Sequence, residues 1–188
     1  LVLTKILSKE LTPALTTHLA HPRGPLANPN RVAVQLPLSN IHQNIRRLLH
    51  YLGDPQRGLR FYHIAGTNGK GSTAVFLQAL LGISCSRIGL FTSPHLEDFR
   101  ERIRIGDRLI SPAEVKEGVS LIRPLCERVA AVPGCSHPTY FEVVTALACR
   151  YFNKNRAGAV VWEVGLGGRL DATNAVIPRV SLITSLSL

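Results

Sequence analysis

Apolar residues recur at helical spacing in some stretches of the chain and run without interruption through others. From residue 41 they fall every three or four positions as far as Gly53-Asp54-Pro55, which predicts a helix over 41–52. Short apolar and β-branched runs predict strands buried on both faces, as in a parallel sheet, at 61–65, 86–91, 159–164 and 180–184. An alternating run at 102–105, followed by Gly106-Asp107, predicts one more strand and a turn.

Helical patterns separate these strands. A helix is expected over 73–81, and two others are announced by a hydroxyl residue three positions before a glutamate: Ser111 with Glu114, and Thr139 with Glu142 ahead of a helix over 141–153. Glu142 therefore has an ordinary structural role open to it. Strands that alternate with helices predict an α/β fold with a doubly wound, mostly parallel sheet.

Composition narrows the class of protein. With 188 residues and 45% apolar content, one sizeable core is expected. No apolar run approaches the ~20 residues that span a bilayer, and no secretory signal is visible, so we expect a cytoplasmic protein without membrane contact. The four cysteines lack metal-site spacing and are interpreted as reduced, mostly structural thiols: Cys85, Cys126, Cys135 and Cys149.

The formal net charge of +10 favours a polyanionic ligand but does not distinguish a nucleotide from a nucleic acid. Residues 1–40 contain a single acidic side chain, Glu10, and form an N-terminal extension that is either disordered or a mitochondrial targeting segment. The first alternative is favoured because five prolines interrupt any long helix. Arg46 and Arg47 have no interleaved aromatic residues, so no nucleic-acid partner is expected.

A glycine-rich loop, Gly66-Thr67-Asn68-Gly69-Lys70-Gly71-Ser72, joins the predicted strand 61–65 to the predicted helix 73–81. Glycines let backbone N–H groups surround a phosphate, the helix N-terminus attracts its charge, and Lys70 would neutralise the outer phosphates. The loop departs from the general phosphate-loop pattern at Ile64 and Gly71, and Ser72 comes one position late. The alternative is a glycine-rich turn that binds nothing.

Glu163 interrupts an otherwise apolar strand, where an unpaired carboxylate would be strongly destabilising. A magnesium ion accompanying nucleotide phosphates would compensate it; the alternative is a salt bridge to Arg169. Three polar segments follow predicted strands, at 66–72, 92–95 and 163–174. Because ligands bind at the carboxyl ends of parallel strands, these segments are expected to meet in one site.

Five motifs in this order resemble the folylpolyglutamate synthase and dihydrofolate synthase branch of the Mur-type ligases, over about 41–188. They are His63 to Ser72, Phe91-Thr92-Ser93-Pro94-His95-Leu96, Arg100-Glu101-Arg102-Ile103, Tyr140-Phe141-Glu142, and Glu163 to Asn174. Leu52-Gly53-Asp54-Pro55-Gln56 also matches. The departures of the glycine loop from the general pattern are those of this family. The resemblance implies that 41–188 is the N-terminal portion of a Mur ligase-type ATP-binding domain.

The resemblance implies a two-step reaction, in which ATP phosphorylates a pterin carboxylate and the amine of L-glutamate attacks the acyl phosphate. Catalysis would be mainly positioning and charge stabilisation, with Lys70 and Glu163 as catalytic residues and ATP and Mg²⁺ as cofactors. The residues implied to hold ATP are Asn68, Gly69, Lys70, Gly71 and Ser72, and those for magnesium are Ser93 and Glu163. The residues implied to line the substrate pocket are Thr139, Tyr140, Phe141, Glu142, Leu170, Asp171 and Ala172. His95 has a weaker claim, and Arg100 and Arg102 are expected to brace their loop.

Asn68, Glu142 and the segment 167–170 resemble the bacterial and fungal dihydrofolate synthases more than eukaryotic folylpolyglutamate synthases. The expected partners are therefore 7,8-dihydropteroate, L-glutamate and ATP, in a monomer. Folate as acceptor, in a folylpolyglutamate synthase or a bifunctional enzyme, is the alternative.

The family continues past residue 188 with an Asp-His pair, a lysine that becomes carbamylated and a C-terminal ligase domain, all absent from this sequence. These 188 residues alone are therefore expected to show little or no ligase activity. A non-catalytic nucleotide-binding fragment is the alternative from another functional class. A basic nucleic-acid-binding domain is suggested only by the charge.

Overall fold

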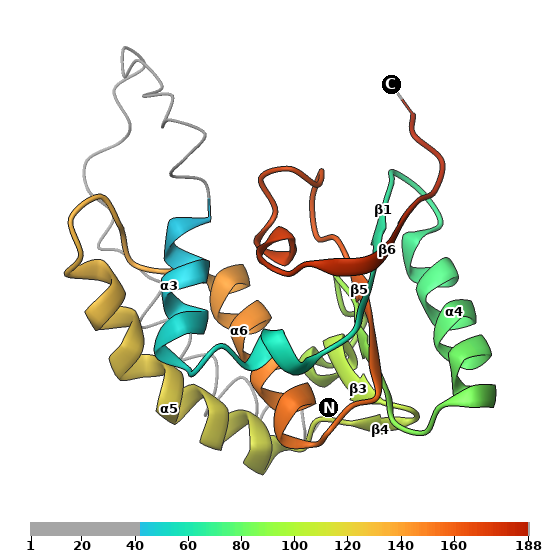
Figure 1. Cartoon of the computed structure of the whole chain (residues 1–188), viewed down its shortest axis with the longest axis horizontal. Coiled ribbons are helices and arrows are strands. Elements are labelled where there is room, and N and C mark those ends of the chain that lie inside the picture. The colour runs from blue at the N-terminus through green and yellow to red at the C-terminus, as the bar shows by residue number, and fades with distance from the viewer. Residues whose placement is uncertain (1–41, 188) are drawn as a thin grey trace. The chain divides into compact units, whose positions relative to one another are not determined.

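The computed structural model describes residues 42–187, in which a single mixed sheet lies between helices (Figure 1). The prediction of an extension over 1–40 lies outside the described residues. The helices are α3 (Gln43–Tyr51), α4 (Lys70–Ser84), α5 (Pro112–Ala130) and α6 (Tyr140–Lys154), with short 3-10 helices η2 (Pro55–Gly58), η3 (Phe99–Arg102) and η4 (Ala172–Ala175). The strands are β1 (Phe61–Ala65), β2 (Ile88–Phe91), β3 (Ile103–Ile105), β4 (Arg108–Leu109), β5 (Ala159–Glu163) and β6 (Pro178–Ile183).

The six strands have the order β4-β3-β2-β5-β1-β6. The central four, β2, β5, β1 and β6, are parallel, whereas β3 and β4 form an antiparallel edge. The predicted α/β fold with a mostly parallel sheet is therefore confirmed. The carboxyl ends of β2, β5 and β1 lie next to one another, so the loops that follow these strands share one edge of the sheet.

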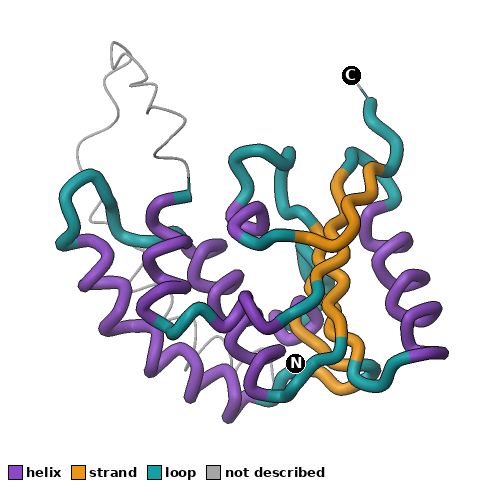
Figure 2. The backbone as a smooth tube through the Cα atoms, in the orientation of Figure 1, coloured by secondary structure: helices purple, strands orange, loops and turns teal. Residues whose placement is uncertain are grey.

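Helices cover both faces of the sheet. Helix α4 lies alone on one face, while α3, α5 and α6 form a layer on the other (Figures 1 and 2). Under α4 the buried side chains come from alternate positions of the strands, including Ile64, Leu90 and Val161. The opposite face carries an aromatic cluster centred on Trp162, whose ring stacks on Phe91 with centroids 4.3 Å apart.

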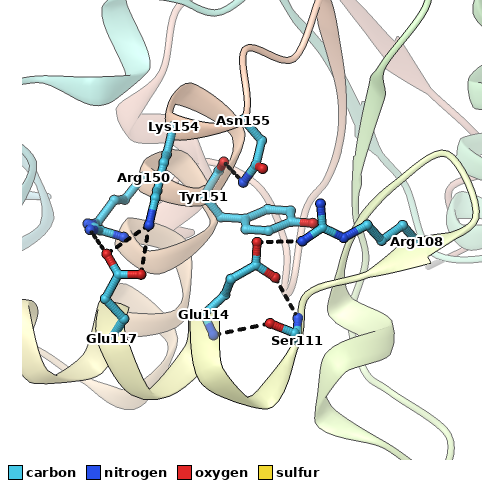
Figure 3. A network of polar contacts seen from close by, with 8 residues as sticks. All are labelled: Arg108, Ser111, Glu114, Glu117, Arg150, Tyr151, Lys154 and Asn155. Carbon is cyan, nitrogen blue, oxygen red and sulfur yellow. Dashed lines mark hydrogen bonds and ion pairs between the residues drawn. The ribbon is translucent and has the colours of Figure 1, made fainter.

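A polar network ties α5 to α6 at the end of the layer away from the loops (Figure 3). Glu117 accepts hydrogen bonds from Arg150 at 2.8 Å and from Lys154 at 2.7 Å. At the start of α5, the side chain of Ser111 caps the helix and that of Glu114 bonds back to the Ser111 N–H, as the sequence predicted. The two capping boxes fix where α5 and α6 begin.

Several element boundaries differ from the sequence expectations. Helix α4 begins at Lys70, inside the glycine loop, because Gly69 in the left-handed region (φ 79°) ends the loop and the Thr73 N–H already bonds to the Gly69 carbonyl. Strand β2 begins two residues later than predicted, at Ile88, after Arg87 with a positive φ of 64°. Strand β6 is shifted towards the N-terminus and begins at Pro178, a position open to proline on an edge strand.

The four cysteines form no disulfide, and Cys126 and Cys149 are buried. Burial raises the pKa of the Cys126 thiol to about 11. This agrees with structural thiols. Within residues 42–187, no helix combines the length and apolar character needed to cross a membrane.

Candidate active site

The glycine loop wraps between the end of β1 and the start of α4. Gly66 has φ 135°, and a Cβ there would collide with Thr184, the residue after β6, so both the turn and the close approach require glycine. The Thr67 N–H bonds to the Ser185 carbonyl at 2.8 Å, which anchors the loop to the segment after β6. Lys70 donates to the Thr67 carbonyl at 3.2 Å, and Asn68 and Ser72 are exposed. The loop is thus preformed, with its lysine folded across it.

Glu163 ends β5 on the α4 side of the sheet, since positions 159, 161 and 163 face α4. It is 4% exposed, and a Cβ built on Gly71 would lie 3.9 Å from both of its carboxylate oxygens. Its Oε2 accepts a hydrogen bond from the Ser93 N–H at 3.0 Å. Three predicted residues from three segments are therefore brought together: Gly71 from the glycine loop, Ser93 from the loop after β2, and Glu163.

The environment of Glu163 opposes its charge. Burial raises the pKa of this carboxyl, while the Ser93 N–H and the positive charges of Lys70 and Arg102 act in the opposite direction. The alternative salt bridge to Arg169 is not formed: among residues 42–187, Glu163 takes part in no ion pair, and its carboxylate accepts only the Ser93 N–H. A buried carboxylate with a single hydrogen bond is left without a full counter-charge.

The donor set at this point fits magnesium. The Ser93 hydroxyl is a buried polar atom without a hydrogen-bond partner, and it adjoins the buried Glu163 carboxylate through the Ser93 N–H. One carboxylate and one hydroxyl, with phosphate oxygens and waters, are ligands that Mg²⁺ accepts. Within 42–187, no group of three or more His, Cys, Asp or Glu side chains is placed to hold a metal ion.

The loop after β2 is held by its own side chains. The Glu101 carboxylate accepts three backbone N–H groups, those of Leu96, Glu97 and Asp98, and these bonds lower its pKa. Asp98 caps η3 and pairs with Arg100 at 2.7 Å. Arg100 therefore braces the loop, as expected.

The N-terminus of α6 lies against the loop that follows β5. A Cβ on Gly165 would come within 2.6 Å of the Phe141 ring and 3.0 Å of the Asp171 carboxylate, so these three residues are in close contact. Tyr140 makes an edge contact with Phe99, with centroids 6.5 Å apart. The segments 139–142 and 165–171 thus meet, and the loop after β2 joins them through Phe99.

Not every predicted substrate residue has a free polar group. Thr139 and Glu142 bond to each other's backbone in the α6 capping box, with the Thr139 N–H donating to Glu142 at 2.7 Å. Ala172 is buried, whereas Leu170 is 69% exposed. Asp171 is buried and accepts hydrogen bonds from the Leu166 N–H at 2.8 Å and from the Thr173 N–H at 2.9 Å.

Two buried contacts of this region did not follow from the sequence. His63 and Thr173 are buried and bond at 3.0 Å, and the Thr173 hydroxyl donates to Asp171. Burial lowers the pKa of His63, against the charge of Asp171. Arg102 is also buried and donates to His95. His95 and Arg102 were named from the sequence as loop residues, and His63 and Thr173 lie within the matched motifs, but no local pattern paired them with each other.

Two hollows lie away from these residues. A cleft of about 560 Å³ is bordered by Arg46, His50 and Arg57 on one side and by residues 174–177 on the other. A second, of about 360 Å³, lies at the C-terminal end of α4, next to Cys85 and Arg104. Neither contains Lys70, Ser93 or Glu163.

Comparisons with known proteins agree on one family. No family model matches the chain. It is 47% identical over 148 residues to a probable bifunctional folylpolyglutamate synthase/dihydropteroate synthase of Haloferax volcanii, which aligns 78% of this chain with 17% of that protein. It is 39% identical over 143 residues to a dihydrofolate synthase/folylpolyglutamate synthase of Bacillus subtilis, which aligns 76% of this chain with 33% of that protein.

Among solved structures, an FPGS complex with AMPPCP and folate matches with a TM-score of 0.77 at 36% identity, covering 94% of this chain and 40% of that chain. The chain thus spans less than half the length of each of these three proteins.

Proposed function

Because this chain belongs to the folylpolyglutamate and dihydrofolate synthase family, we propose that the whole protein ligates L-glutamate to a pterin carboxylic acid with ATP, through an acyl phosphate. The preferred acceptor is 7,8-dihydropteroate, which gives dihydrofolate. The observation that carries the proposal is the contact of a preformed phosphate loop with a buried carboxylate and an unpartnered serine hydroxyl.

In this proposal the loop residues Asn68 to Ser72 hold the ATP phosphates with their backbone N–H groups and with the Lys70 ammonium. Ser93 and Glu163 hold the magnesium ion, which neutralises phosphate charge when bound. The ring of Phe141 and the side chains near it orient the pterin acid so that its carboxylate meets the terminal phosphate. Residues 41–188 form the N-terminal portion of a Mur ligase-type ATP-binding domain, and 1–40 an extension to it.

Folate is the alternative acceptor, in a folylpolyglutamate synthase or a bifunctional enzyme. The solved FPGS complex with AMPPCP and folate supports this alternative. The Bacillus relative is named for both activities and therefore supports either acceptor. A purely nucleotide-binding role for these 188 residues is the alternative from another class.

Nucleotide binding can be tested directly on this chain. AMPPCP titrated calorimetrically should bind in the presence of magnesium, and Lys70→Ala should weaken binding by about 10- to 100-fold because a charge-assisted contact is lost. Lys116→Ala, on an exposed position of α5, is the matched control and should bind as the parent does. Equal affinities of the parent and Lys70→Ala would contradict the assigned role of the loop.

A turnover assay distinguishes a glutamate ligase from a protein that only binds nucleotide. Release of ADP that requires both 7,8-dihydropteroate and L-glutamate, measured on the whole protein, supports ligation. Replacing dihydropteroate with folate in the same assay ranks the two acceptors. AMPPCP binding without acceptor-dependent ADP release would leave only the nucleotide-binding alternative.

A further inference from the structure

Arg102 is a buried cation at the junction of the three loops. It ends η3 and is 9% exposed, and its Nε donates a hydrogen bond to Nδ1 of His95 at 2.8 Å. An arginine side chain is rarely buried unless a partner compensates its charge. The partner of the Nε is a neutral ring nitrogen, which supplies no negative charge.

The two carboxylates that belong to η3 and its cap, Asp98 and Glu101, are not free to pair with Arg102. Asp98 is already paired with Arg100, and the Glu101 oxygens accept the backbone N–H groups of the same loop. Within residues 42–187, the two terminal nitrogens of Arg102 take part in no hydrogen bond and no ion pair. The two terminal nitrogens therefore keep their four N–H donors unused, in a planar arrangement suited to a bidentate anion.

The charge of Arg102 acts to lower the pKa of two groups from different segments, Glu163 and Tyr140. Burial raises the pKa of the Glu163 carboxyl and the Arg102 charge opposes this. Burial likewise raises the pKa of the Tyr140 phenol, again against Arg102. Arg102 thus lies within electrostatic range of both the carboxylate proposed to hold magnesium and the phenol of Tyr140 at the start of α6.

The surroundings of Arg102 favour a carboxylate on an aromatic ring over a nucleotide phosphate as its partner. Nucleotide phosphates have their own cation in Lys70 and their own N–H donors at the start of α4, on the β1 side of Glu163. The side of Arg102 is aromatic: Tyr140 packs on Phe99, and Phe99 packs on the ring of His95, with centroids 6.4 Å apart. An anion attached to an aromatic ring matches both the unused N–H donors of Arg102 and the aromatic side chains beside it.

We propose that the terminal nitrogens of Arg102 bind the carboxylate of the aromatic acid substrate and hold it beside the magnesium site. The inference rests on the proposed function, since it takes the acceptor to be an aryl carboxylic acid. His95 is a positioning residue that fixes the guanidinium through its Nε. The same contact keeps the carboxylate oriented for attack on the terminal phosphate.

The test removes the charge from each partner in turn. The full 188-residue chain, saturated with AMPPCP and magnesium, is titrated with pteroate and with its analogue lacking the benzoate carboxylate. The parent should prefer pteroate by about 10- to 100-fold, as expected for a charge-assisted pair. Arg102→Gln should bind the two compounds equally, and Arg102→Lys should keep part of the preference because it keeps the charge without the planar pair of donors.

The controls separate this contact from folding and from the nucleotide site. Lys116→Ala, on an exposed position of α5, should keep the full preference for pteroate. AMPPCP affinity should be unchanged in Arg102→Gln and Arg102→Lys, with circular dichroism of both matching the parent.

Undiminished preference in Arg102→Gln would overturn the inference, and so would an equal loss of affinity for both compounds, which indicates packing only. Loss of AMPPCP affinity instead would assign Arg102 to phosphate. If the parent binds AMPPCP but not pteroate, the acceptor assignment and this inference both fail while the nucleotide site stands. If the parent binds neither compound, the proposed function itself fails.

Discussion

At the scale of single residues, the site is built from groups that destabilise the fold without ligands. Glu163 is buried with one hydrogen bond, the Ser93 hydroxyl has no partner, and the Arg102 guanidinium lacks a counter-ion. The buried carboxylate and the buried hydroxyl each cost free energy in the protein alone. Their concentration at the ends of three neighbouring strands indicates that bound charges compensate them, because stored instability of this kind is typical of functional sites.

Gly165 illustrates how tightly the substrate side is packed. Replacing Gly165 by Ala should displace the Phe141 ring, since the new Cβ would come within 2.6 Å of it, and should destabilise the protein by about 1–3 kcal/mol through overpacking. Urea unfolding measures this loss. Gly168→Ala is the matched control in the same loop, because a Cβ there meets nothing within 4 Å. Equal stabilities of the two variants would show that the loop moves freely away from α6.

The sequence revealed some of these residues and hid others. Glu163 could be identified because it breaks an apolar run, a property of its own segment. The arginine whose charge acts on Glu163 could not be identified in the same way. Arg169 lies only six positions away along the chain, but the charge comes from Arg102, which belongs to a different loop. The buried contact of His63 with Thr173 joins positions 110 apart. Such pairs depend on strand order, which local patterns do not specify.

At the scale of elements, the starts of the two capped helices, α5 and α6, were the most predictable features. The capping boxes at Ser111 and Thr139 were confirmed because each depends on four consecutive residues. Strand limits were less accurate. They depend on pairing partners, as for β2, whose first residue Ile88 is set by its register with Ala159.

The capping box of α5 predicts that the free energy of unfolding depends on pH. Although burial acts to raise the pKa of Glu114, hydrogen bonds from Ser111 and the charge of Arg108 prevail and hold it below its ordinary value of 4.5 (Figure 3). The charged carboxylate therefore stabilises the fold fully above pH 4.5, and this contribution is lost as pH falls through the lowered pKa. Glu114→Gln should lower the free energy of unfolding by about 1 kcal/mol at neutral pH, and by progressively less below pH 4.5.

Urea titrations of both proteins across this pH range measure the difference. Glu97→Gln is the control, since the Glu97 side chain makes no hydrogen bond or ion pair among residues 42–187. A difference between Glu114→Gln and the parent that stays constant down to the acid transition would mean that the carboxylate is not held in its charged form by the cap.

At the scale of the whole molecule, the two faces of the sheet are covered unequally. Three helices lie on one face, but α4 alone covers the other, and only Ala74 and Gln78 of α4 are buried. Its outer side carries an apolar stripe at helical spacing, formed by Phe76, Leu80 and Ile83, which are 71%, 64% and 82% exposed. Contiguous exposed apolar surface of this kind promotes association and binds apolar dyes.

We therefore expect this chain to bind the dye ANS and to lose soluble protein on concentration, and the double substitution Phe76→Gln with Leu80→Gln to reduce both effects. The free energy of unfolding should change by no more than about 0.5 kcal/mol, because neither side chain packs in the core. ANS fluorescence, the soluble fraction and urea unfolding of parent and variant provide the measurement. Leu121→Gln, which removes a half-exposed leucine from α5 on the other face, should leave ANS binding as it is. A loss of stability well above 1 kcal/mol in the double variant would instead mean that another part of the protein, or a second copy, covers the stripe in solution, since exposed side chains contribute little to the free energy of unfolding.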